Sequence, residues 1–296
     1  KSEMFDMSKN NLVTIAIPTY KRPELIINSL KSLEKQTTKN FQIFISVNGD
    51  ERNNSGYEEI EHLYRNNNKV SFFYQNKNIG SIKNFLFLLS KCQTKYFMWL
   101  ADDDTVSPEC LEILVDILDK NKDAVTAVPY WERIIDDKID LIIPSHFHQD
   151  NILSRIIKFC AKTDDVFFYG LHKTENIKKC SFKDFWKPNK ELISQWAYIY
   201  IFDLLFQGKI IFRFDERAKW TNNHSSLKQY SIDEKSNLFS NFKKIIKEIN
   251  INYQYIFKII KWKKFHFLPI MFFLLTLFFF RKLFKLAKNK IFKKKT

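Results

Sequence analysis

The sequence predicts an α/β protein with a mainly parallel β-sheet flanked by helices. Short apolar runs alternate with amphipathic helical segments through residue 120, which is typical of parallel sheets with helices on both faces. The 296 residues include only 5 Gly and 7 Pro, too few for a turn-rich all-β protein. Because the basic charge is concentrated near the C-terminus, we expect an α/β domain at residues 1–235 and a helical, membrane-associating tail at residues 236–296.

The first strand is predicted at residues 11–20, where the β-branched run NLVTIAIPTY is interrupted by Pro18. The next segment, RPELIINSLKSLEKQ, has apolar residues at helical spacing, and Pro23 suits the first turn of that helix. A second strand, FQIFISVNGD, closes on a turn at Asn48 and Gly49.

A polar helix at residues 57–65 and a third strand, KVSFFYQN, continue the alternation. The helix NIGSIKNFLFLLSKC then leads to the fourth apolar run, YFMWLA. Ser107 and Pro108 predict the N-cap and the first position of the following helix. In such sheets ligands bind at the carboxyl ends of the strands. The residues expected to share that edge are Thr19, Asn48, Asn78 and the aspartates at 102–104.

Three consecutive aspartates, Asp102, Asp103 and Asp104, end the fourth apolar run. Neighbouring carboxylates repel one another and raise one another's pKa. Carboxylate oxygens are the ligands that Mg²⁺ and Mn²⁺ prefer. The alternative is a turn that caps the next helix, but a single aspartate would suffice for that role. The cluster therefore predicts a site for a divalent metal.

The net charge of +15 lies almost entirely in the tail, because residues 241–296 carry a net +14 and the first 240 residues a net +1. A nucleic-acid binder would carry its basic patch on the folded domain, so no nucleic-acid partner is expected. The basic segments bracket FLPIMFFLLTLFFF at residues 267–280. This run is too short for a confident membrane span and contains Pro269, so it predicts a segment lying on an anionic membrane surface rather than a buried core helix.

The four cysteines show no CxxC spacing, which favours free thiols in a reducing compartment. The first ten residues lack the apolar segment of a secretory signal peptide. We therefore expect the protein at the cytoplasmic face of the cell membrane, attached peripherally or monotopically through its tail.

Five segments, in this order, resemble family 2 glycosyltransferases of the GT-A fold, of the type that builds bacterial surface glycans. They are VTIAIPTYKRPELIINSLKSLEKQ, NKNIGSIKNFLFLLS, YFMWLADDDTVSPECLEIL, FFYGLHKTENIKKCSF and LLFQGKIIFRFDERAKWTNNHSS. The resemblance covers about three quarters of the chain. It implies a GT-A fold and a donor that is a nucleoside-diphosphate sugar, expected to be a UDP-sugar.

The resemblance also implies which residues hold the donor and the metal. The residues implied for the donor are Pro18, Thr19, Tyr20, Arg22, Asn48, Asp50, Asn78, Gly80, Lys83, Asn84, Asp102 and Asp103. Those implied for Mn²⁺ or Mg²⁺ are Asp102, Asp104 and His224. Val47 stands where the family has an acid for the nucleoside, and Asp50 is a candidate replacement.

The general base is ambiguous in this sequence. The family places an acid just before a Trp, but Gln195 precedes Trp196 here, and a glutamine cannot accept the proton. Glu191, one helical turn earlier on the same face, is the favoured carboxylate. Asp203 is a second candidate. The remaining possibility is that the position has been altered and the protein is a poor catalyst.

The expected function is metal-dependent, inverting transfer of a sugar to a lipid-linked saccharide or surface glycan at the membrane. Two alternatives stay open at this point. Val47 and Gln195 also fit a non-catalytic membrane adaptor built on a degenerate transferase fold. The string DDDTV fits the haloacid-dehalogenase phosphatases, in which the first aspartate, here Asp102, is the nucleophile. That motif normally lies on the first strand of its domain, whereas three predicted strands precede it here.

Overall fold

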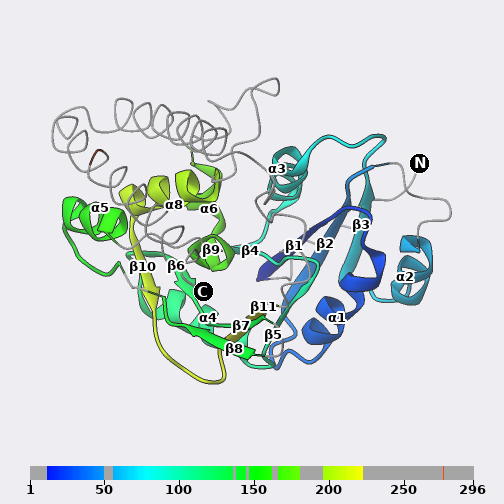
Figure 1. Cartoon of the computed structure of the whole chain (residues 1–296), viewed down its shortest axis with the longest axis horizontal. Helices are drawn as coiled ribbons and strands as arrows, with labels where there is room; N and C mark the ends of the chain where they lie inside the picture. The colour runs from blue at the N-terminus through cyan, green and yellow to red at the C-terminus, as the bar shows by residue number, and fades with distance from the viewer. Residues whose placement is uncertain are drawn as a thin grey trace, which may run out of the picture. The chain divides into compact units, whose positions relative to one another are not determined.

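The computed structural model describes residues 12–49, 56–135, 138–144, 147–161, 166–180, 196–222 and 276 (Figure 1). The chain divides into two compact units. The first comprises Lys1–His148, Val166–Lys179 and Gln207–Tyr230, and the second comprises Gln149–Asp165, Cys180–Phe206 and Ser231–Thr296. The expected boundary between residues 235 and 236 lies outside the described residues and stays a prediction. Within the described part of the chain, we find no helix with the length and apolar character needed to cross a membrane.

The first unit contains a seven-stranded sheet with the order β10-β6-β9-β4-β1-β2-β3. Its strands are β1 (Val13–Thr19), β2 (Phe41–Val47), β3 (Val70–Tyr74), β4 (Tyr96–Trp99), β6 (Ala124–Val128), β9 (Leu171–Lys173) and β10 (Lys209–Phe212). All neighbouring pairs are parallel except those of β9, which runs antiparallel to β4 and to β6. The predicted mainly parallel sheet is therefore confirmed.

The helices of this unit cover both faces of the sheet. They are α1 (Pro23–Glu34), α2 (Tyr57–Tyr64), α3 (Ser81–Lys91), α4 (Cys110–Lys120) and α6 (Thr174–Lys178), with a short 3₁₀ helix at Val166–Tyr169. Figure 1 shows α3 on one face and α1 and α4 on the other. The chain runs outward from β1 to β3 and then returns to place β4 beside β1. The strand order thus reverses between β1 and β4, and in α/β sheets this reversal is where ligands bind.

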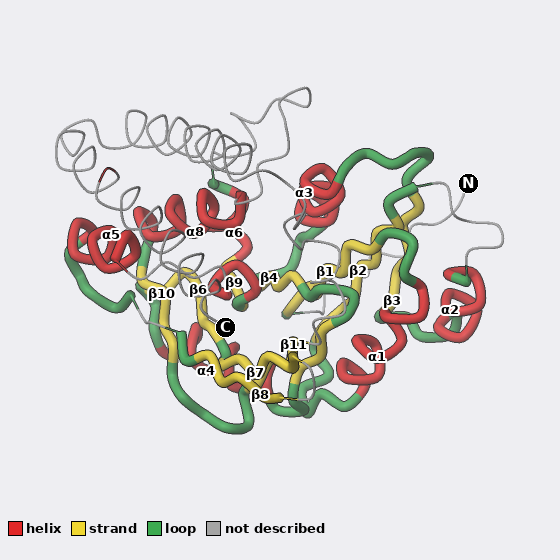
Figure 2. The backbone as a smooth tube through the Cα atoms, viewed as in Figure 1, coloured by secondary structure: helices red, strands yellow, loops and turns green. Residues whose placement is uncertain are grey.

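A second, four-stranded sheet with the order β5-β11-β7-β8 was not predicted. It consists of β5 (Asp104–Val106), β7 (Tyr130–Ile135), β8 (Lys138–Ile142) and β11 (Lys219–Asn222), drawn in yellow in Figure 2. The strand β5 begins at the last aspartate of the cluster and pairs antiparallel with β11, which places Asn222 opposite Asp104. This sheet therefore brings Asn222, at the end of the described range 196–222, to the aspartates.

The first strand extends past its predicted interruption, because β1 includes Pro18 and ends at Thr19. All seven of its residues are buried, as expected for a central strand. The ladder to β4 ends at Ala16, whose carbonyl accepts the Leu100 N–H at 3.0 Å. Residues Ala16 and Pro18 direct their backbone groups to the same side, so the missing N–H of Pro18 removes no ladder hydrogen bond.

Ser107 is not the N-cap of α4, and that prediction was wrong. The helix begins at Cys110 with Glu109 as its N-cap. The Ser107 hydroxyl instead accepts the Lys219 N–H at 2.7 Å and donates to the Arg217 carbonyl at 2.5 Å. A side chain already bonded to the β11 segment cannot cap a helix as well, and the helix starts two residues later than predicted.

The second unit contains α5 (Ile152–Ala161) and most of α8 (Trp196–Gln207). Arg155 ties these helices together, since its Nε donates to the Leu205 carbonyl at 3.0 Å and its Nη1 to the Gln149 carbonyl at 2.6 Å. The helix α8 is apolar, and the side chain of Asp203 within it is fully buried.

Candidate active site

Thr19 and Asp102 meet where the strand order reverses. Thr19 ends β1, and its hydroxyl donates to Asp102 Oδ2 at 2.7 Å. Arg22, at the N-cap of α1, donates from Nη2 to Asp102 Oδ1 at 2.5 Å. Tyr57 lies beneath this pair, with its hydroxyl 2.6 Å from Thr19 Oγ1 and accepting the Arg22 backbone N–H at 3.0 Å. Tyr57 was not predicted as a site residue, because a tyrosine at a helix start has no distinctive pattern.

The surroundings of Asp102 disfavour the charged form of its carboxylate. Burial raises its pKa to about 6, although the Arg22 charge and the Thr19 hydrogen bond both lower it. The charge of neighbouring Asp103 raises the pKa further. Arg22 also approaches Asp103, with 3.7 Å between Nη1 and Oδ2. Arg22 and Thr19 thus offset the effect of burial on Asp102 only in part, and a bound cation would favour the ionised form of this carboxylate.

The turn that carries the aspartates is fixed from α1 by Ser29. Its hydroxyl oxygen lies 3.0 Å from the Asp102 carbonyl oxygen and 2.7 Å from the Asp104 carbonyl oxygen. Ser29 is fully buried, so these hydrogen bonds satisfy polar groups that water cannot reach. The three carboxylates are therefore presented by a turn whose backbone is anchored to the sheet and to a helix.

The side chain of Asp104 is anchored by β11. Trp220 Nε1 donates to Asp104 Oδ2 at 2.9 Å, and Asn222 Nδ2 donates to Asp104 Oδ1 at 2.8 Å. The Trp220 ring stacks on Trp131 of β7, with 5.0 Å between centroids and 5° between planes. Trp220 and Asn222 were not identified from the sequence as site residues. They lie within the segment that resembles the end of the family domain, two residues before His224 in the case of Asn222.

A second group of predicted residues lies at the same carboxyl edge, after β2 and β3. Asn48 donates from Nδ2 to Asn78 Oδ1 at 3.1 Å and accepts the Ile79 N–H at 2.9 Å. Asn78 Oδ1 also accepts the Gly80 N–H at 2.8 Å. Gly80 has φ +85° and ψ 153°, a conformation that only glycine adopts without strain. The loop before α3 is thus pre-formed by its own hydrogen bonds.

The other predicted donor residues differ in burial, and one of them, Asn84, makes structural contacts. Asn84 is buried, where its Oδ1 accepts the Ser46 hydroxyl at 2.6 Å and its Nδ2 donates to the Ser46 carbonyl at 3.0 Å. This side chain fastens α3 to β2. Pro18 is buried within β1, Tyr20 is exposed, and Lys83 is half-buried in the first turn of α3.

Four predicted residues lie outside the described part of the chain: Asp50, Glu191, Gln195 and His224. The remaining candidate base, Asp203, belongs to the second unit. The described structure therefore brings Thr19 and Arg22 together with the aspartate cluster and leaves the general base as a prediction.

The chemistry of the donor atoms suits a hard divalent cation. Asp102 and Asp104 offer buried carboxylate oxygens, and Asn222 Oδ1 is buried with no hydrogen-bond partner among the described residues. No group of three or more His, Cys, Asp or Glu side chains in the described ranges could hold a metal ion. His224, the predicted third ligand, lies beyond those ranges. The metal site accordingly stays a prediction that the oxygen donors support.

Comparison with known proteins gives relatives that are named glycosyltransferases. An uncharacterized glycosyltransferase, RC0461 of Rickettsia conorii, is 34% identical over 132 residues, covering 44% of this chain and 21% of that protein. The abequosyltransferase RfbV of Salmonella typhimurium is 32% identical over 114 residues, covering 38% and 34%. The chain thus matches about a fifth to a third of the length of these two relatives. An uncharacterized glycosyltransferase, MJ1057 of Methanocaldococcus jannaschii, is 25% identical over 74% of this chain and 77% of that protein.

Solved structures with a similar fold include S. aureus TarS. Its residues 1–349 in complex with UDP-GlcNAc superpose with a TM-score of 0.57 at 15% identity, covering 84% of this chain and 71% of that one. At this identity the likeness shows the fold, which is the predicted GT-A fold. The family model for glycosyl transferase family 2 matches residues 14–178, a stretch that includes β1, the aspartate cluster and β9. The chain belongs to glycosyl transferase family 2.

Proposed function

We propose that this protein transfers a sugar from a nucleoside-diphosphate donor, a UDP-sugar, to an acceptor at the membrane, with inversion at the anomeric carbon. The observation that carries the proposal is the convergence of Thr19, Arg22, Asp102 and Asp104 where the strand order reverses. Nucleotides bind at this position in α/β sheets. The likeness to a protein solved with UDP-GlcNAc supports the choice of donor.

In this proposal the donor lies along the carboxyl edge between β1 and β4. Thr19 and Arg22 fix the rotamer of Asp102, so that its carboxylate faces the donor in one orientation. Trp220 and Asn222 do the same for Asp104. A divalent cation held by Asp102, Asp104 and His224 would supply the positive charge that neutralises the diphosphate leaving group.

The chemical step requires a carboxylate that takes the proton of the acceptor hydroxyl. As that proton leaves, the hydroxyl oxygen bonds to the anomeric carbon and the bond from that carbon to the diphosphate oxygen breaks. The electron pair departs with the nucleoside diphosphate, which accounts for inversion in a single displacement. We assign the proton transfer to Glu191, because Gln195 has no basic oxygen at neutral pH.

The acceptor in this proposal is a lipid-linked saccharide or surface glycan at the cytoplasmic face of the membrane. Support comes from the tail, which carries a net charge of +14. Its basic segments flank an apolar run at residues 267–280. Each Lys or Arg near an anionic surface contributes about 1 kcal/mol of attraction, so a fraction of these residues would suffice for adhesion.

A second candidate is a non-catalytic adaptor on the same fold. Val47, where the family has an acid, is fully buried at the end of β2, and the candidate replacement, Asp50, lies outside the described residues. The haloacid-dehalogenase alternative is no longer a candidate, because the aspartates follow the fourth strand of a family 2 glycosyltransferase.

The two candidates differ in metal-dependent nucleotide binding. We would measure thermal unfolding of the full chain with UDP, GDP, ADP and CDP, each with Mn²⁺ and with EDTA. The transferase proposal expects one nucleotide, UDP, to raise the unfolding temperature only with Mn²⁺. Asp104→Asn should lose this increase, while Asp116→Asn on the exposed face of α4 should keep it. A panel with no stabilisation by any nucleotide would favour the adaptor.

A further inference from the structure

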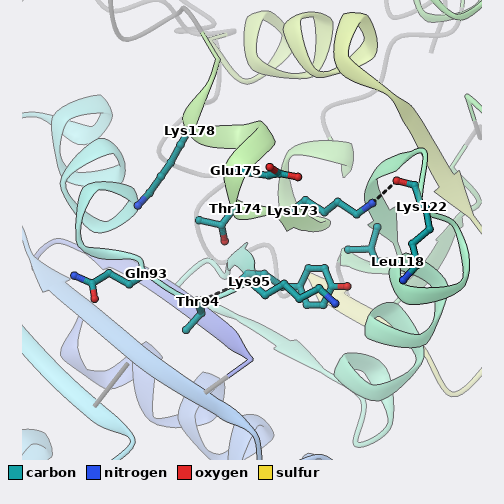
Figure 3. A pocket seen from close by; sticks show the side chains of 10 residues that line it. Gln93, Thr94, Lys95, Leu118, Lys122, Lys173, Thr174, Glu175 and Lys178 are labelled. Carbon is teal, nitrogen blue, oxygen red and sulfur yellow. Dashed lines mark hydrogen bonds between the residues drawn. The ribbon is translucent and has the colours of Figure 1, made fainter. Parts of the chain in front are cut away.

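A cavity lined by several lysines lies in the first unit, at the edge of the sheet opposite to the aspartates. It is formed where β4 begins, β9 ends, and the chain leaves α4, and its volume is about 530 Å³ (Figure 3). Its lining residues are Gln93, Thr94, Lys95, Tyr96, Leu118, Lys122, Lys173, Thr174, Glu175 and Lys178. The strand β4 runs from this cavity toward Asp102, and its three residue steps alone separate the two regions by about 10 Å.

The cavity carries an excess of positive charge. Its lining contains four lysines and one acid, Glu175. That acid forms an ion pair with Lys179, outside the lining, at 3.6 Å. Lys95 is neutralised by Asp119, with 2.6 Å between Nζ and Oδ1. Asp123, which also lies near Lys173, forms an ion pair with Lys209 at 2.6 Å. Each of these three carboxylates therefore has a lysine other than Lys122 and Lys173 as its ion-pair partner.

Two of the lining lysines, Lys122 and Lys173, lie next to each other. Lys173 Nζ donates to the Lys122 carbonyl oxygen at 2.7 Å, the contact drawn as a dashed line in Figure 3. Neither ammonium group forms a salt bridge with a described residue. Burial and the charges of Lys122 and Lys95 lower the pKa of Lys173, and the charges of Glu175 and Asp123 offset this only in part. The fold thus holds like charges together around a concave surface, an arrangement that an anion would stabilise.

We propose that this cavity is a binding site for the phosphate group of a phosphate-bearing ligand, separate from the donor site. Ammonium groups that converge on one cavity suit the charge of a phosphate, and they bind it as point charges. The side chain of Gln93 adds a neutral hydrogen-bonding group to the lining. The cavity volume exceeds that of a phosphate alone, so the site has room for a larger ligand that carries the phosphate. A soluble phosphorylated molecule and an anionic lipid headgroup share this chemistry.

The first experiment measures pyrophosphate binding by isothermal titration calorimetry, using the full chain in EDTA at low ionic strength. The variant Lys122→Gln/Lys173→Gln removes the two unpaired charges. The variant Lys31→Gln/Lys35→Gln, on the exposed face of α1, removes the same charge elsewhere. We expect the affinity for pyrophosphate to fall by about tenfold or more in the first variant and to change little in the second. Charges close to the bound anion contribute most of the attraction, because distant charges are screened.

The second experiment separates the two ligand sources. Sedimentation of the same three proteins with vesicles of phosphatidylglycerol or of phosphatidylcholine measures headgroup binding, and the basic tail is common to all three. A loss of phosphatidylglycerol binding confined to Lys122→Gln/Lys173→Gln assigns the site to a lipid headgroup. Unchanged vesicle binding together with weakened pyrophosphate binding assigns it to a soluble ligand.

The proposal is overturned by equal weakening in both double variants, or by the absence of any binding that depends on Lys122 and Lys173 in either experiment. Unfolding temperatures of the variants exclude loss of the fold as the cause. The same preparations report on the donor site independently, because Lys122→Gln/Lys173→Gln should retain the Mn²⁺-dependent stabilisation by UDP. Absence of that stabilisation in the wild type would overturn the proposed function and leave the phosphate-site proposal intact.

Discussion

Asn222 faces Asp104 across the antiparallel pair of β5 and β11 and donates to its Oδ1 at 2.8 Å. The two residues are 118 positions apart in the sequence. Trp220, on the same strand, donates to the other carboxylate oxygen at 2.9 Å. The geometry of the last aspartate is therefore set by a strand that forms only when the end of the transferase domain returns to the sheet. Local sequence around the cluster does not determine it.

Replacing Trp220 by Phe should lower both stability and metal-dependent nucleotide binding. The variant keeps an aromatic ring on Trp131 and loses the N–H that binds the Asp104 carboxylate. A hydrogen bond to a charged group contributes about 1.5–3 kcal/mol, so the free energy of unfolding should fall by about that amount in denaturant titrations. Trp131→Phe is the control, because Trp131 Nε1 has no hydrogen-bond partner among the described residues. Equal losses in the two variants would contradict a specific role for the Trp220 hydrogen bond.

The parallel core of the fold could be predicted because each of its elements is local in sequence. The strands β1 to β4 and the helices between them follow the apolar pattern closely, with Pro23 at the start of α1 as expected. The small sheet could not be predicted in the same way. Its strand β5 has three residues, and β11 has four, so neither shows a recognisable period. Pairing between strands more than 100 residues apart depends on tertiary packing, which a short stretch of sequence does not encode.

Residues of the candidate site could be predicted where they form a cluster of charge or lie in a segment that resembles the family. The aspartates, Thr19 and Arg22 were found in this way. Ser29 and Tyr57 were missed because their roles depend on a buried neighbour that is distant in sequence, namely the aspartate turn for Ser29 and Thr19 for Tyr57. Asn84 was assigned to the donor, but its contacts with Ser46 become visible only when α3 is packed on β2.

Arg22 and Asp102 should show a strong energetic coupling in a double-mutant cycle. Their charged atoms lie 2.5 Å apart, and Asp102 is almost fully buried while Arg22 is partly exposed. Arg22→Gln leaves a buried carboxylate with less compensation, whereas Arg22→Gln/Asp102→Asn removes both charges. Unfolding free energies of the two single variants and the double variant should give a coupling of about 1–3 kcal/mol. Strictly additive effects would show that the ion pair contributes nothing to the fold.

The stability of the domain should depend on the protonation of His172 between pH 6.5 and 4. Burial lowers the pKa of His172 to about 4, and a neutral ring fits its contacts, since Nε2 donates to the Phe168 carbonyl and Nδ1 accepts from the Thr126 hydroxyl. Below pH 6.5 the unfolded chain binds a proton that the folded domain excludes, so the free energy of unfolding decreases until the pH reaches about 4. The shift corresponds to about 3 kcal/mol.

The measurement is the difference in unfolding free energy between the wild type and His172→Gln at each pH, because carboxylates titrate in the same range. Glutamine retains an N–H group for the Phe168 carbonyl and has no proton to gain. The wild type should lose more stability than the variant as the pH falls from 6.5 to 4, and the difference should be constant below that. Parallel pH profiles would mean that His172 binds a proton equally in both states.

Glu191→Ala should abolish sugar transfer and leave donor binding intact, if Glu191 is the general base. Loss of a positioned base lowers the rate by about 10²–10⁴-fold, while the Mn²⁺-dependent stabilisation by UDP depends on the aspartates and should remain. Gln195→Ala is the matched control and should retain transfer, because a glutamine side chain takes no proton. Wild-type turnover by Glu191→Ala would exclude this residue. If Asp203→Asn then lost turnover while keeping its unfolding temperature, the role would pass to Asp203.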